Sequence, residues 1–224
     1  HPLRAEIIAT KLANKIGNDM GFNFVNRMQE ETGATVVEIA NSYTMSCAVF
    51  ELEEFWQKAS NIANACVFIG KKIKKGGSPE KLFTLGLFHD CGIPVMAMKY
   101  KDYQDILDQA VNTPSIPLTQ IEEKAYGVNH ATIGYYVASS WRLPKDVCQI
   151  ILQHHERDYL DKLNGSPEQD LFAILKLAEH IISLKYIEIA SPDWAYLEEA
   201  VLSILAINKA DLVKVIAEII ESLK

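Results

Sequence analysis

The sequence has no G-x-G-x-x-G motif, no alternation of strands and helices, and no apolar run near the ~20 residues that a membrane-spanning helix requires. Basic residues are also few, because 22 Lys and Arg stand against 29 Asp and Glu and give a formal net charge of −7. Nucleic acids and anionic membrane surfaces attract proteins with a basic face. We therefore do not expect a dinucleotide-binding α/β enzyme, and we expect neither nucleic acid nor a membrane as a partner.

Cysteine is scarce as well. The four residues Cys47, Cys66, Cys91 and Cys148 are scattered and form no C-x-x-C pair. This pattern is typical of a reduced protein with buried thiols, and no secretory signal sequence is recognisable, so we expect a cytoplasmic location. The first residue is His rather than Met, which favours a fragment, a processed form or an engineered product.

What the chain does contain is a large apolar fraction, 49% of 224 residues, enough for a substantial core in one large domain or two small ones. The apolar residues recur at helical spacing, and the β-branched runs carry that spacing too. Ser-Pro pairs at 78–79, 166–167 and 191–192 each place a helix N-cap before a proline. The predicted fold class is all-α, a multi-helix bundle.

Local signals refine this prediction. Thr35-x-x-Glu38 and Thr119-x-x-Glu122 have the spacing of capping boxes, and Asn129 is a candidate N-cap for the helix that begins near His130. Residues 99–118 are polar and contain prolines. They are expected to be a connection between helices.

The candidate site begins with an adjacent pair, His89 and Asp90, at the end of an apolar helix. The polar residues expected to meet this pair are His130, at a helix start, and the doublet His154-His155. Imidazole and carboxylate groups are ligands of borderline divalent metals such as Zn, Fe, Mn and Ni. Such an ion generates a hydroxide nucleophile near neutral pH and polarises a phosphoryl oxygen. These five residues are therefore a candidate divalent-metal site.

Each member also has a purely structural interpretation. His89 and Asp90 would be a buried hydrogen-bonded pair that closes a helix, and for the pair alone this is favoured. His130 would be a surface residue at a helix N-terminus, where a neutral imidazole is preferred to a cation. His154 and His155 would be a buried pair whose hydrogen bonds are satisfied.

The beginning of the chain carries one family resemblance. The segments His1-Pro-Leu-Arg-Ala-Glu-Ile-Ile-Ala-Thr10 and Gln29-Glu-Glu-Thr-Gly-Ala34, with a helix ending in Val49-Phe50-Glu-Leu52, resemble the C-terminal helical region of large bacterial NAD-dependent glutamate dehydrogenases. That region lies outside the catalytic domain of those enzymes, so the resemblance implies no dehydrogenase activity. It implies a separate N-terminal helical segment, residues 1–54.

A second resemblance covers the chain from about residue 55. It rests on a combination of motifs: Trp56-x-x-x-Ser60, Leu87-Phe-His89-Asp90-x-Gly92, the segment from Glu122/Glu123 to Gly127-x-x-His130-x-x-x-Gly134, Trp141-x-Leu-Pro144 and Ile150-Ile-x-x-His154-His155. Together these resemble the HDOD family, bacterial signalling domains related to the HD metal-dependent phosphohydrolases. The resemblance implies an HD-like helical domain over residues 55–224 and a regulatory rather than a catalytic role.

Two positions depart from the catalytic HD pattern. Lys58 stands where those enzymes have a histidine ligand, and Glu179 stands where they have an aspartate ligand. A protonated ammonium cannot bind a metal, so Lys58 is expected to pair with Asp90 and to fill one metal position. A second position, built from Asp90, His130, His154 and His155, keeps all its ligand types.

Three hypotheses follow. The first is a non-catalytic bacterial signalling or scaffolding module with a degenerate metal site and an unidentified protein partner. The second is a divalent-metal phosphohydrolase that acts on a phosphodiester or a nucleotide. The third is a chimeric or purely structural helical bundle with no evolved site. The sequence leaves the oligomeric state open.

Overall fold

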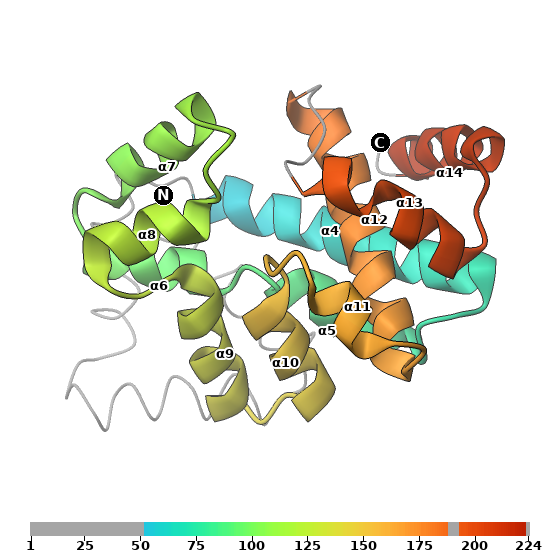
Figure 1. The fold of residues 1–224 in the computed structure, drawn as a ribbon, viewed down its shortest axis with the longest axis horizontal. Coiled ribbons are helices and arrows are strands. Elements are labelled where there is room, and N and C mark those ends of the chain that lie inside the picture. The colour runs from blue at the N-terminus through green and yellow to red at the C-terminus, as the bar shows by residue number, and fades with distance from the viewer. Residues whose placement is uncertain (1–51, 188–192, 223–224) are drawn as a thin grey trace.

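The computed structural model describes residues 52–187 and 193–222, and within these ranges every regular element is a helix (Figure 1). The all-α prediction is therefore confirmed. The helices expected before residue 52, the Thr35-x-x-Glu38 box and the Ser191-Pro192 helix start lie outside the described residues. The helices are α4 (Leu52–Ile73), α5 (Pro79–Phe88), α6 (Gly92–Lys99), α7 (Tyr103–Asn112), α8 (Leu118–Tyr126), α9 (His130–Ser140), α10 (Lys145–Gln153), α11 (Tyr159–Leu163), α12 (Pro167–Ile187), α13 (Trp194–Leu205) and α14 (Lys209–Ser222).

The long helix α4 runs through the middle of the molecule, and α12 crosses it (Figure 1). The two helices share one apolar core with α5 and α10, in which Ile69, Leu85, Ile151 and Ile174 are completely buried. Burying one such side chain contributes about 1.5–3 kcal/mol. Helices α6, α7 and α8 lie at one end of α4, and α14 contacts α4 closer to the opposite end (Figure 1).

Several predicted helix starts are confirmed. The Ser78 side chain accepts a hydrogen bond from the Lys81 backbone N–H, with Pro79 as the first residue of α5. The Asn129 side chain accepts from the Thr132 backbone N–H and caps α9. Helix α12 begins at Pro167, as the second Ser-Pro pair predicts.

Two local predictions are wrong. Residues 99–118 are not only a connection, because they contain α7, whose Tyr103, Ile106, Leu107 and Ala110 follow helical spacing between polar residues. The Thr119-x-x-Glu122 box does not cap a helix. Helix α8 begins at Leu118, before the box, and Glu122 is completely buried. No described helix is both long enough and apolar enough to span a membrane.

A close contact between backbones fixes the helices that carry the site. A Cβ atom at Gly92, the first residue of α6, would lie 1.9 Å from the His130 carbonyl oxygen and 2.8 Å from the Gly134 nitrogen of α9. Helices α6 and α9 thus approach at a distance that only glycine permits. This contact places the start of α9 directly beside the turn that joins α5 to α6.

We expect Gly92→Ala to destabilise the protein by about 3 kcal/mol or more, because two backbones must separate to admit the methyl group. Gly77→Ala is the control. Gly77 has φ +78°, but no atom lies within 4 Å of the place that its methyl group would take. Gly77→Ala should therefore lower the free energy of unfolding only through the strain of an alanine in a left-handed conformation, about 1–2 kcal/mol. Urea unfolding gives both free energies, and equal costs would contradict this account of the contact.

Candidate metal centre

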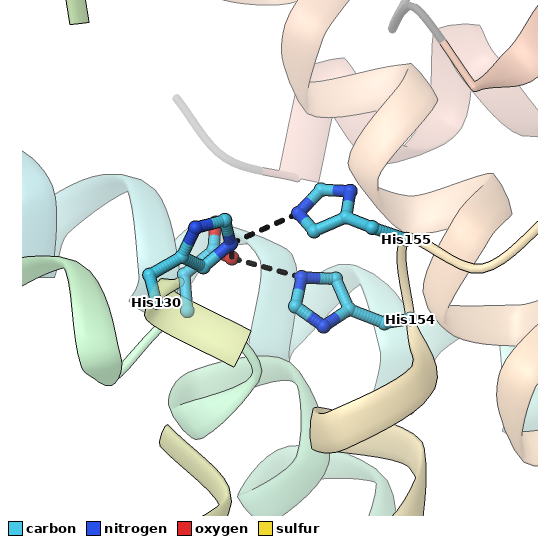
Figure 2. Close-up of side chains that lie close together, drawn as sticks. His130, His154 and His155 are labelled. Carbon is cyan, nitrogen blue, oxygen red and sulfur yellow. Dashed lines mark hydrogen bonds and ion pairs between the residues drawn. The ribbon is translucent and has the colours of Figure 1, made fainter. Parts of the chain in front are cut away.

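The structure brings the predicted residues together from three separate segments. His89 and Asp90 lie in the turn between α5 and α6, where the Ile93 N–H donates to the Asp90 carbonyl. His130 is the first residue of α9, and His154 and His155 follow the last residue of α10. Figure 2 shows the three labelled imidazole rings of His130, His154 and His155 pointing toward one another. The gathering around Asp90 that the sequence predicts is therefore present.

Four of these residues form one compact group. Asp90, His130, His154 and His155 each offer a ligand atom, and these atoms all lie within 4.8 Å of one another. Asp90 Oδ1 lies 3.1 Å from His154 Nε2 and 3.6 Å from His130 Nε2. His130 Nε2 lies 3.0 Å from His155 Nε2. Two ligands of one ion bound at about 2.0–2.2 Å lie about 2.8–4.4 Å apart, so these three separations fit ligands of a single ion.

The other ring nitrogen of each histidine faces a hydrogen-bond acceptor. His130 Nδ1 lies 2.7 Å from Glu122 Oε2, and His154 Nδ1 lies 2.7 Å from the Ile151 carbonyl oxygen. His155 Nδ1 lies 3.2 Å from Asp193 Oδ2. A neutral imidazole has one proton, and we assign it to Nδ1 in each ring because the partners there are acceptors. Three Nε2 lone pairs then converge on the same point.

Burial keeps two of these rings neutral. It lowers the pKa of His154 despite the neighbouring Asp90 carboxylate. It lowers the pKa of His155 further, and there the neighbouring His154 adds to the effect of burial. Burial alone would raise the pKa of Asp90, but the charge of His89 and the contacts with His154 outweigh it and hold that pKa well below its usual range. Neutral imidazoles beside an ionised carboxylate are the protonation states that bind a metal.

His89 lies outside the group of four. Its Nδ1 donates to the Gly86 carbonyl oxygen at 2.8 Å, and its Nε2 lies 3.1 Å from Asp90 Oδ2 and 3.5 Å from Glu179 Oε1. Burial lowers the pKa of His89, but the charges of Asp90 and Glu179 and the hydrogen bonds outweigh it and raise that pKa. His89 thus lies between two carboxylates, and their charges favour its protonated form.

The expected pairing of Lys58 with Asp90 is wrong. Lys58 is exposed, and it forms no ion pair with any residue that the structure describes. It lines one pocket with Asp90, a cavity of about 190 Å³ whose other lining residues are Phe55, Ala59, Ile62, His89, Ile93 and Leu107. A different lysine lies near the site: the Nζ atom of Lys176 lies 2.9 Å from Glu179 Oε2.

Three residues that matter for this site were not predicted to support it. Glu122 accepts hydrogen bonds from the His130 backbone N–H and from the Tyr103 hydroxyl, in addition to its contact with the His130 ring. Lys176 and Asp193 lie 3.0 Å apart, with Asp193 directly behind His155. One signal was available for Lys176, because it interrupts an apolar run from 171 to 178, and a lysine within a buried helix face needs a carboxylate partner.

An all-helical domain with a buried His/Asp group at a helix junction defines the class of this protein. The family model of the HDOD domain matches residues 29–157, more than half of the chain, and the chain therefore belongs to the HDOD family. The match includes all five predicted ligands. It begins ahead of residue 55, where the sequence places the start of the HDOD-like domain.

Similarity to curated proteins is partial. The NAD-specific glutamate dehydrogenase of Pseudomonas aeruginosa is 36% identical over 62 residues, which are 28% of this chain and 4% of that enzyme. This agrees with the first of the two resemblances seen in the sequence. The chain spans only a small fraction of that relative's length.

Solved structures share the fold at low identity. The MmoQ response regulator of Methylococcus capsulatus has a TM-score of 0.57 and 19% identity, over 76% of this chain and 64% of that one. A protein of Shewanella amazonensis, whose name proposes a phosphohydrolase, has a TM-score of 0.56 and 18% identity, over 89% and 77%. At these identities the likeness shows the fold alone.

The pKa shifts of His154 and His155 predict acid sensitivity of the metal-free protein. An unfolded histidine takes up its proton near pH 6.5, whereas these two folded rings take it up at lower pH. The free energy of unfolding should therefore fall as the pH drops below 6.5, by up to about 1.4 kcal/mol per pH unit for each ring. The raised pKa of His89 changes the free energy of unfolding only above pH 6.5, so it does not contribute to the change expected below that pH.

Urea unfolding of chelator-treated protein at pH 6.5 and 5.5 measures this loss. His155→Gln removes one of the two titrating rings and should flatten the dependence relative to the unsubstituted chain. An equal change in the free energy of unfolding between the two pH values in both proteins would show that His155 is not held neutral.

Proposed function

We propose that this chain is a non-catalytic HDOD signalling module in which Asp90, His130, His154 and His155 bind one divalent cation. The observation that carries the proposal is the 3.0 Å separation between the Nε2 atoms of His130 and His155. With the protons on Nδ1, that contact joins two lone pairs and lacks a hydrogen. A cation between them converts a repulsive contact into two bonds.

Counting protons strengthens the argument. When all three rings are in the neutral form they have three protons for six nitrogens, and each nitrogen faces an acceptor or another ring nitrogen. Moving a proton from Nδ1 to Nε2 relieves one contact and leaves the other unsatisfied. Because unsatisfied buried polar groups cost about 1–3 kcal/mol each, a central positive charge is the arrangement that satisfies every ring.

The ligand set favours a structural ion. Three imidazoles and one carboxylate complete a four-coordinate shell, and sites closed by four protein ligands are typical of structural metals. This donor set suits Zn, Fe or Ni better than Mg or Ca. When bound, the ion would supply a fixed positive charge that ties the α5–α6 turn to α9 and to the end of α10. We propose that the module acts through a protein partner in the cytoplasm.

The second candidate, a metal-dependent phosphohydrolase, is favoured by one observation. The side chains of Asp90 and His155 retain 25% and 26% exposure, and the pocket of about 190 Å³ reaches Asp90. A substrate oxygen would approach from that side. Turnover of bis(p-nitrophenyl) phosphate by metal-loaded protein, lost in His130→Ala, would favour this candidate over the first. We expect no such turnover.

The first proposal predicts close to one equivalent of transition metal per chain after purification without chelator. His130→Ala and His154→Ala should each reduce it to background, and chelation should lower the melting temperature of the unsubstituted chain but not of these two variants. His180→Ala is the matched control, because His180 is also buried but stacks on Trp194 outside the group. A metal content at background in the unsubstituted protein would contradict the proposal and favour a helical bundle with no metal site.

Glu122→Gln should weaken metal binding about 10- to 100-fold, the usual effect of removing a carboxylate behind a ligating histidine. The amide retains the size of the side chain but not its charge, so the His130 ring becomes less basic and less firmly oriented. A competition titration against a chromophoric chelator gives the affinity. Glu123→Gln, a change at the exposed neighbour, should leave it unchanged.

A further inference from the structure

Lys176 is a charged residue in the most apolar part of α12. Its side chain is only 1% exposed, and its neighbours Leu175 and Leu177 are completely buried. A buried ammonium is tolerated only when it is paired, because its desolvation is otherwise too costly. The position therefore requires negative groups around it.

Two carboxylates supply that charge from different elements. The Lys176 Nζ lies 2.9 Å from Glu179 Oε2, one turn further along α12, and 3.0 Å from Asp193 Oδ2, just before α13. The pKa of Asp193 is lowered, since His155 and Lys176 outweigh the effect of burial. The ammonium thus occupies the point where two carboxylates converge, as a metal ion would.

The same carboxylates connect this point to the group of four. Asp193 Oδ2 contacts the His155 ring from behind, and Glu179 Oε1 lies 3.5 Å from His89, which in turn contacts Asp90. Two positions suited to a cation therefore belong to one network of contacts. The first is bounded by the three Nε2 atoms and Asp90, and the second holds the Lys176 ammonium.

We propose that Lys176 is a built-in cation that takes the place of a second metal ion and limits this chain to one. The proposal rests on the proposed function in taking the group of four as the first metal position. Removing the ammonium takes away the one lysine that pairs with both Glu179 and Asp193, which are partly buried, and opens space between the two carboxylates. A divalent cation with hard-ligand preference, such as Mn²⁺, would then fill the space with water as additional ligands.

The test compares the total divalent metal bound per chain in Lys176→Ala and in the unsubstituted protein, by equilibrium dialysis against Mn²⁺ with analysis of all transition metals. The variant should bind one equivalent more. The double variant Lys176→Ala/Glu179→Gln should lose the gain, because one of the two carboxylates is neutral. Lys214→Ala is the matched control. Lys214 pairs with Asp211, three residues away as Glu179 is from Lys176, at an N–O distance of 3.1 Å, but the Lys214 side chain is 70% exposed.

The difference between the two proteins decides the inference separately from the proposed function. A change from one to two equivalents supports both, and a change from none to one supports the role of Lys176 while the proposed function fails. If the variant and the unsubstituted protein bind the same number of equivalents, whether one or none, the proposed role of Lys176 is overturned.

If Lys176→Ala is unfolded without metal, refolding in Mn²⁺ replaces dialysis as the measurement. Recovery of helical circular dichroism with Mn²⁺, absent in the double variant, supports the inference. Failure to recover, or equal recovery in the double variant, overturns it.

Discussion

The structure depends on the hydrogen bond at the Nδ1 atom of each inward-facing imidazole. Glu122, the Ile151 carbonyl and Asp193 each fix one ring, and they belong to three different parts of the chain. Each bond sets both the direction of a ring and the nitrogen that keeps its lone pair. These three bonds favour the orientation in which the Nε2 atoms face the region beside Asp90.

Apolar packing fixes the turn that carries His89 and Asp90. Phe88, which directly precedes His89, packs edge-on against Trp56 of α4 and Trp141 after α9, at centroid distances of 6.4 and 5.2 Å. The α5–α6 turn is therefore fixed from both sides, while Gly92 fixes its separation from α9. The site therefore has supports in the backbone and the apolar core in addition to the hydrogen bonds that orient its rings.

The sequence predicted the helical class, the caps at Ser78 and Asn129, and the residues that gather at Asp90. These rest on local spacing and on motifs that occupy consecutive positions. It did not predict the network around them, since Lys176, Asp193 and Glu122 meet their partners only after α12, α13 and α8 have packed. Lys58 illustrates the same limit, because its place in a motif predicted a contact with Asp90 that the exposed side chain does not make. Helix α7 was missed for a different reason: its apolar residues are few, and the surrounding prolines and polar residues outweighed their spacing.

Helix α7 has a consequence for how the domain responds to its surroundings. The Tyr103 hydroxyl donates to Glu122 Oε1, and the other oxygen of the same carboxylate contacts the His130 ring. A peripheral helix, exposed along much of its length, is thus two hydrogen bonds away from the interior imidazole. Displacement of that helix must therefore either break the phenol contact or move the carboxylate that orients the His130 ring.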